Sequence, residues 1–173
     1  MSTSTLLPFS PLAINLILSL GVFYMAYHWM LKPVLPRINP IAVLTPILLL
    51  HAFRHLGMMF ISPGVASPDI PWQFAWPAAA GDFLAASLAM VAVTLLQRKS
   101  SLAIPALWLF NVVGSLDFAS AIILSRVFQA SSFLGAAYWI PVFWVPMLIV
   151  GHIIIFNMLG MNKRGEISIQ SKA

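Results

Sequence analysis

Residues 8–31, PFSPLAINLILSLGVFYMAYHWML, form a stretch of 24 residues without a charged side chain. The hydrocarbon core of a bilayer is about 30 Å thick, and about 20 consecutive apolar residues in a helix are enough to cross it. The first basic residues, Lys32 and Arg37, follow the apolar stretch, whereas a cleaved signal peptide carries its positive charges in front. The stretch therefore predicts a first membrane-spanning helix that is retained.

Four further apolar stretches follow, at about 39–61, 75–97, 101–124 and 139–161. The whole chain of 173 residues is 61% hydrophobic and 8% charged. Soluble globular proteins have about 25% charged residues, so this composition excludes a soluble domain. We therefore expect an all-α fold, an integral membrane bundle of five transmembrane helices. It would form one domain over 1–161, followed by a solvated cytoplasmic tail over 162–173.

The distribution of basic residues predicts the orientation of these spans. Seven Lys and Arg residues lie in the first and third connections and the tail, whereas the fourth connection contains Arg126 alone and Arg54 lies inside a span. Cytoplasmic loops are enriched in Lys and Arg, so we expect the N-terminus outside and the C-terminus in the cytoplasm. We expect the protein to be a multi-pass protein of the cell membrane, in a bacterial inner membrane. Because the basic residues lie at span ends, the expected partner is the lipid bilayer and not nucleic acid.

Ionisable side chains inside the spans are expensive in lipid, and each therefore predicts a partner and a function. At a rise of about 1.5 Å per residue, Arg54, Asp82 and Asp117 lie about 10 Å below the outer ends of three different spans. This shared level predicts an ion-paired cluster in the outer half of the membrane. Residues i, i+3 and i+4 of an α-helix share a face, which predicts that His51, Arg54 and His55 point the same way.

We expect these groups to form a buried polar pocket that opens outward beneath a loop rich in Pro and Trp, at about 62–77. The leading functional hypothesis is binding or transport of a small solute or proton. In it, Asp82 and Asp117 accept protons or cations and Arg54 supplies the counter-charge. A purely structural clamp between spans two, three and four is the alternative. The complete predicted pocket set is Arg54, His55, Asp82, Asn111, Ser115 and Asp117.

The histidines support a second class of hypothesis, a membrane oxidoreductase or hydrolase. His51 and His152 come from different spans at compatible depth and would be the two axial ligands of a b-type haem. Alternatively, His51, His55 and His152, together with Asp82 or Asp117, would bind zinc or iron. A protein without any cofactor agrees equally well with the sequence. The chain contains no Cys, which excludes thiolate metal sites and disulfides.

Two further expectations concern the assembly. Span three is rich in small residues between Ala78 and Ala92, and small side chains allow helices to approach closely in lipid. We therefore expect span three at the centre of the bundle, with the large side chains of spans one and five toward lipid. A chain this small also predicts a homodimer, or an accessory subunit of a larger membrane complex, as the third functional hypothesis.

Four runs of the sequence resemble known proteins. The runs HAFRHLGMMF at 51–60, PGVASPDIP at 63–71 and PAAAGD at 77–82 resemble small multi-span inner-membrane proteins of bacteria with no assigned activity. The run GAAYWIPVFWVP at 135–146 shares this resemblance, which implies a membrane location and no chemistry. A weaker likeness is to zinc-dependent intramembrane hydrolases of the ceramidase kind, which also combine HxxxH, a further His, Asp and Ser.

Overall fold

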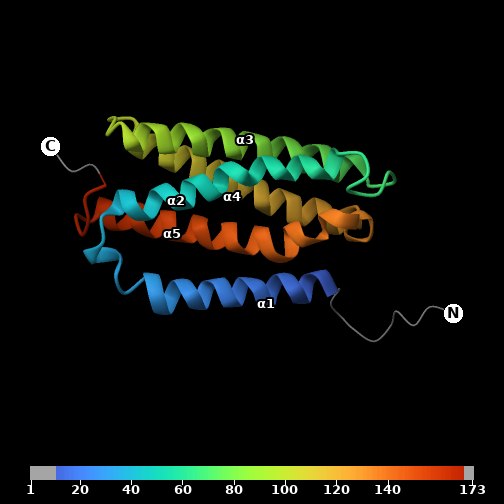
Figure 1. The fold of residues 1–173 in the computed structure, drawn as a ribbon, viewed down its shortest axis with the longest axis horizontal. Coiled ribbons are helices and arrows are strands. Elements are labelled where there is room, and N and C mark those ends of the chain that lie inside the picture. The colour runs from blue at the N-terminus through green and yellow to red at the C-terminus, as the bar shows by residue number, and fades with distance from the viewer. Residues whose placement is uncertain (1–10, 170–173) are drawn as a thin grey trace.

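The structure is a computed structural model that describes residues 11–169. This part of the chain contains helices and no β-strand, as Figure 1 shows. The five long helices are α1 (Pro11–Ala26), α2 (Pro40–Ala52), α3 (Trp72–Gln97), α4 (Ala103–Val127) and α5 (Val145–Lys163). Three shorter segments lengthen them, namely the π-helix η1 (Tyr27–Leu31) after α1, the 3₁₀-helix η3 (Phe53–Ile61) after α2 and the π-helix η6 (Ile140–Trp144) before α5.

Five helical units are long and apolar enough to cross a membrane, and this confirms the expected all-α architecture. Their bounds are Pro11–Leu31, Pro40–Ile61, Trp72–Gln97, Ala103–Val127 and Gly135–Lys163. The largest difference from the predicted bounds is at the start of the fifth unit, which begins at Gly135 and not at about 139. The third unit begins at Trp72 and not at about 75, so the loop before it, expected at about 62–77, is shorter than expected.

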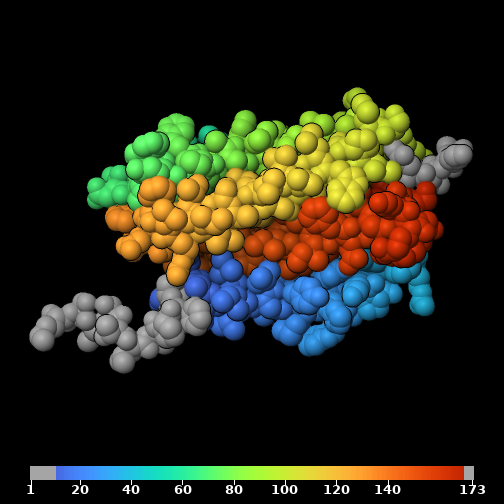
Figure 2. Space-filling model, turned by 180° about the vertical axis from the view of Figure 1, so that it is seen from behind, coloured from blue at the N-terminus to red at the C-terminus, as the bar shows by residue number. Residues whose placement is uncertain are grey.

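The helices form layers, and the expected place of span three is wrong. α3 packs against α2, η3 and α4. α5 contacts α2 and α4 on one side and α1 on its other side (Figure 1). Figure 2 shows α4, in yellow, between α3 in green and α5 in orange to red. α5 is therefore the most buried of the five helical units and α1 the least.

The small residues of α3 explain its position at one side of the bundle. Ala85, Ala89 and Ala92 are buried and allow the neighbouring helices to approach on one face of α3. The opposite face carries Phe83 and Met90, which are exposed. Small residues thus predicted the tight contacts of α3 correctly, but they did not predict that these contacts are confined to one face.

The loop between η3 and α3 packs against the connection between α4 and α5. The Ser67 N–H donates to the Phe133 carbonyl over 2.9 Å, and the Ala136 N–H donates to the Val65 carbonyl over 2.9 Å. Gly135 has a φ of +52°, and a Cβ there would lie 2.6 Å from the Val65 carbonyl oxygen. The two connections therefore close one end of the bundle together.

At the opposite end, part of the C-terminal tail is packed rather than solvated. Ile169 is 1% exposed and belongs to the larger apolar core. Its N–H donates to the Asn162 side-chain oxygen over 2.9 Å. The expectation of a fully solvated tail is therefore wrong for this segment, because Ile167 and Ile169 cover the end of the core; residues 170–173 lie outside the described residues.

Two apolar cores occupy the two ends of the bundle. The larger core contains Leu48 of α2 and Ala89 of α3, and the smaller contains Phe60 of η3 and Ala78 of α3. Between these positions the same two helical units carry polar side chains. The candidate site therefore lies between two apolar layers.

Candidate functional site

The 3₁₀ geometry of η3 determines which side chains of the second helical unit face the interior. A 3₁₀-helix has three residues per turn, and the buried residues here recur at intervals of three, as His51, Arg54, Gly57 and Phe60. His55 is exposed, and its Nδ1 lies 2.9 Å from a carbonyl of its own helix. The expectation that His55 shares the face of Arg54 is therefore wrong, because it assumed α-helical spacing.

Arg54 forms ion pairs with both aspartates, as the shared depth predicted. Its Nε donates to Asp82 Oδ1 over 2.9 Å, and its Nη2 donates to Asp117 Oδ2 over 2.5 Å. The Arg54 side chain is fully buried, whereas the carboxylates remain 13% and 10% exposed. Two further contacts were not predicted. Nη1 donates to the Gly114 carbonyl over 3.2 Å, and the guanidinium carbon lies 3.7 Å from the centroid of the Phe118 ring.

His152 adds a neutral partner to this cluster. Its Nε2 lies 3.3 Å from Arg54 Nη1, and because a guanidinium can only donate, Nε2 must accept. The proton of the neutral ring is then on Nδ1, which donates to Asn111 Oδ1 over 2.6 Å. Asn111 Nδ2 in turn donates to the His152 carbonyl over 3.2 Å. Asn111 thus fixes one tautomer of His152, while Ser115 donates to a carbonyl of its own helix.

The arrangement of the histidines does not fit a haem. Axial imidazoles lie on opposite faces of the macrocycle, but the His51 and His152 ring centroids are only 4.3 Å apart. The described residues also contain no group of three or more His, Cys, Asp or Glu side chains placed to hold a metal ion. His55, the third predicted ligand, is exposed. The predicted haem and metal ligand sets are therefore not assembled.

Four glycines, which the sequence analysis did not single out, provide the space for the polar side chains. A Cβ at Gly57 would overlap the Asp82 carboxylate, and one at Gly81 would overlap the Asp117 carboxylate. The other two glycines face Arg54, His51 and His152. The four are Gly57, Gly81, Gly114 and Gly151. The sequence did contain a signal for them, because these glycines lie at about the same depth in their helices as the ionisable residues.

Gly114 is the one glycine of these four at which a Cβ would meet both Arg54 and His152. A Cβ there would lie 2.7 Å from His152 Cε1 and 2.9 Å from Arg54 Nη1. Its carbonyl oxygen also accepts from Arg54. Gly114 thus both accommodates Arg54 and binds it.

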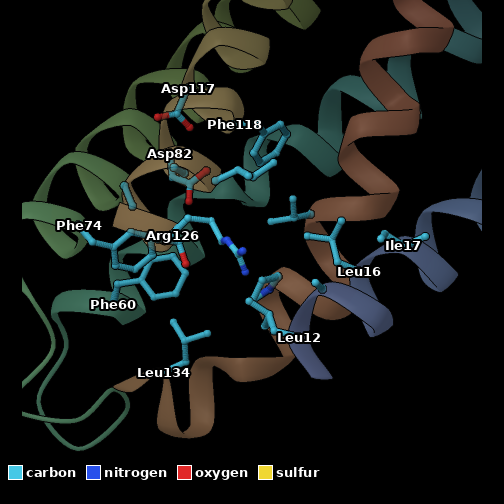
Figure 3. Close-up of a pocket in the computed structure, with 17 residues that line it drawn as sticks. Leu12, Leu16, Ile17, Phe60, Phe74, Asp82, Asp117, Phe118, Arg126 and Leu134 are labelled. Carbon is cyan, nitrogen blue, oxygen red and sulfur yellow. The ribbon is translucent and has the colours of Figure 1, made fainter. Parts of the chain in front are cut away.

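A cavity of about 220 Å³ lies beside the ion pairs. Its walls come from α1, η3, α3, α4 and the connection leading into α5, and they are mostly aliphatic and aromatic. Figure 3 shows Asp82 and Asp117 at one end of this cavity and Leu12 and Leu134 at the other. Arg126 also lines it. Of the six residues of the predicted pocket, Asp82 and Asp117 line this cavity, whereas Arg54, His55, Asn111 and Ser115 do not.

Comparison with known proteins identifies a family and no activity. No curated protein and no solved structure matches the chain. The resemblance to small bacterial inner-membrane proteins therefore stays a prediction. Residues 11–160 match a family model described as "Domain of unknown function (DUF8737)", which covers all five helices up to Gly160, and the chain therefore belongs to this family.

Proposed function

We propose that this protein is a multi-pass membrane protein that binds a small solute or a proton in the cavity beside Asp82 and Asp117 and transports it across the bilayer. The distribution of basic residues supports an N-terminus outside, and the resemblance to small inner-membrane proteins supports a place in a bacterial inner membrane. The observation that carries the proposal is an excess of negative charge at the cavity wall. Two carboxylates contact one guanidinium, so the cluster has a formal charge of −1 when both are ionised.

His152 does not change the charge of this cluster, because it accepts a hydrogen bond from Arg54 and is therefore neutral. Arg126 is a second cation on the cavity wall, but within the described residues it forms no ion pair with either carboxylate. A net charge inside lipid is expensive, and a proton or a bound cation at either carboxylate would cancel it. Arg54 has no exposed side-chain surface and four hydrogen-bonding partners, so it acts as the fixed counter-charge. The carboxylates, which line the cavity, are the exchanging groups.

Two observations favour this reading over the alternatives. A clamp between the second, third and fourth helical units would account for the two ion pairs, but it does not account for the cavity onto which both carboxylates open. The redox and metal hypotheses require a ligand set that the described residues do not assemble.

The oligomeric state is a separate proposal. We expect a homodimer or a larger complex, to be measured by native mass spectrometry of protein extracted in mild detergent.

Proton flux into liposomes tests the proposal. The protein is reconstituted with a pH-sensitive dye inside the vesicles, and flux is driven by a potassium diffusion potential. We expect flux above that of protein-free liposomes, and a loss of most of it in Asp82→Asn and Asp117→Asn. Asp69→Asn is the matched control, because Asp69 is exposed in the loop and its removal should leave flux unchanged.

The result that rejects proton transport is a flux equal to that of protein-free liposomes, or equal flux in the wild type and in both Asn variants. Circular dichroism and thermal unfolding of each variant establish that the bundle is intact. If proton transport is rejected, binding of a small solute remains to be tested. In that test, small organic cations that stabilise the wild type against heat should fail to stabilise Asp117→Asn.

A further inference from the structure

A second cavity, of about 260 Å³, lies on the other side of the polar cluster. The first cavity reaches Phe60 on the second helical unit and Val145 on the fifth. The second is lined by Ile47, Leu50 and His51 of the second unit and by five residues of the fifth, namely Met147, Leu148, Val150, Gly151 and Ile154. α1 and η1 provide the remaining wall. Arg54 and the ion pairs therefore lie between the two cavities along the second helical unit.

His51 is the exceptional residue of this second wall. It is fully buried, and within the described residues neither of its ring nitrogens has a hydrogen-bonding partner. A neutral imidazole carries one donor and one acceptor, and native proteins rarely leave such buried groups unpaired. Trp144 Nε1 is also buried and unpaired, but Trp144 does not line either cavity.

Two residues of the cavity wall lie beside His51 Nε2. A Cβ at Gly151 would lie 2.7 Å from His51 Nε2 and 3.3 Å from the Ile47 side chain. Both Gly151 and Ile47 line the cavity. The absence of a side chain at Gly151 thus leaves the space beside Nε2 that a methyl group would fill.

We infer that this second cavity binds a small, largely apolar molecule that carries one hydroxyl or carbonyl group, held by a hydrogen bond to His51. The apolar wall favours the body of such a molecule, since apolar pockets with few polar groups are typical small-molecule sites. Besides His51, Tyr27 is the lining residue with a polar side chain, and its hydroxyl already accepts from Asn157. A cavity of about 150 Å³ is enough for benzene, so a monocyclic alcohol or phenol fits here.

The site would also communicate with the polar cluster. The His51 ring contacts the His152 ring, and His152 accepts a hydrogen bond from Arg54. A ligand on His51 therefore lies two side chains from Arg54. The inference itself does not require transport, because it rests on the cavity and on the unpaired imidazole.

Nitrogen NMR of the full-length protein in detergent, with ¹⁵N-labelled histidine, tests the site. The probes are phenol and benzene, which differ by the hydroxyl group, and each is referenced to protein-free micelles. We expect phenol to shift the His51 ring nitrogens and to bind about three- to tenfold more tightly than benzene, which is the net effect of one hydrogen bond. His51→Phe should abolish the preference for phenol, and the exposed His55→Phe should retain it.

A second variant keeps the test decisive if His51→Phe does not fold. Gly151→Ala places a methyl group against Nε2 and should weaken phenol binding while leaving the polar cluster intact. The inference is overturned if neither probe moves the His51 resonances, as expected of a cavity filled with water. It is equally overturned if phenol and benzene bind alike.

Discussion

Replacing Arg54 by Gln separates the charge balance of the cluster from its packing. The change leaves Asp82 and Asp117 together without their cation, so the formal charge of the cluster becomes −2 when both are ionised. Asp82→Asn or Asp117→Asn instead removes the excess charge and keeps Arg54 paired with the other carboxylate. The structure therefore predicts a large loss of stability on removing the cation and little change on removing one anion, although each substitution deletes one member of the same network.

The magnitude follows from the contacts of Arg54. Removing one partner of a buried ion pair costs about 3–5 kcal/mol, because the other charge remains buried and unpaired. The Gly114 carbonyl and His152 Nε2 also lose their donor. We therefore expect Arg54→Gln to lower the free energy of unfolding by about 3–5 kcal/mol. Asp117→Asn loses one charged hydrogen bond but also the excess charge, and it should stay within about 1.5 kcal/mol of the wild type.

Unfolding by SDS in mixed micelles, followed by circular dichroism, measures these differences. The matched control is Arg164→Gln, since Arg164 forms an exposed ion pair with Glu166 in the tail and its loss should leave stability unchanged. The triple variant of Arg54→Gln with both Asp→Asn substitutions should recover part of the loss. The reasoning is refuted if Arg54→Gln is as stable as Asp117→Asn, or if the triple variant is no more stable than Arg54→Gln alone.

Two further predictions concern residues beside Arg54. Gly114→Ala places a methyl group 2.7 Å from His152 Cε1, and such overpacking costs about 1–3 kcal/mol. Its stability should fall by that amount below Gly21→Ala, which meets no atom within 4 Å; equal thermal unfolding of the two variants would contradict the packing. Asn111→Leu leaves the His152 Nδ1–H and carbonyl without their partner and should cost about 1–3 kcal/mol in SDS unfolding; a loss smaller than that of the peripheral Asn15→Leu would speak against the assigned tautomer.

The membrane helices and the ion pairs were predictable because each depends on a one-dimensional property of the sequence. Span length follows from the thickness of the hydrocarbon core. Depth follows from counting residues at a fixed rise. Because an unpaired charge in lipid has a high free energy, Arg54 is expected to pair with the carboxylates at the same depth. These constraints brought Arg54, Asp82 and Asp117 together without any knowledge of the packing.

The rotation of each helix about its axis was not predictable in the same way. In a soluble helix the polar face indicates which side is exposed, but the outward-facing and the buried sides of these helices are both apolar. The burial of α5 and the one-sided packing of α3 therefore left no pattern in the sequence. The four glycines of the site were missed for a related reason, since the importance of Gly57 depends on Asp82 lying opposite it on another helix.

The wrong prediction that His55 shares a face with Arg54 results from the 3₁₀ geometry of η3. Three residues turn through about 300° in an α-helix and about 360° in a 3₁₀-helix. Continuing α2 as an α-helix would rotate Arg54 by about 60° relative to His51, and Gly57 by about twice as much. Gly57 would then no longer face Asp82. The 3₁₀ segment, the glycine and the ion pairs are thus parts of one arrangement. In it, a tighter helix aligns His51, which lines the second cavity, with Arg54, whose two carboxylate partners line the first.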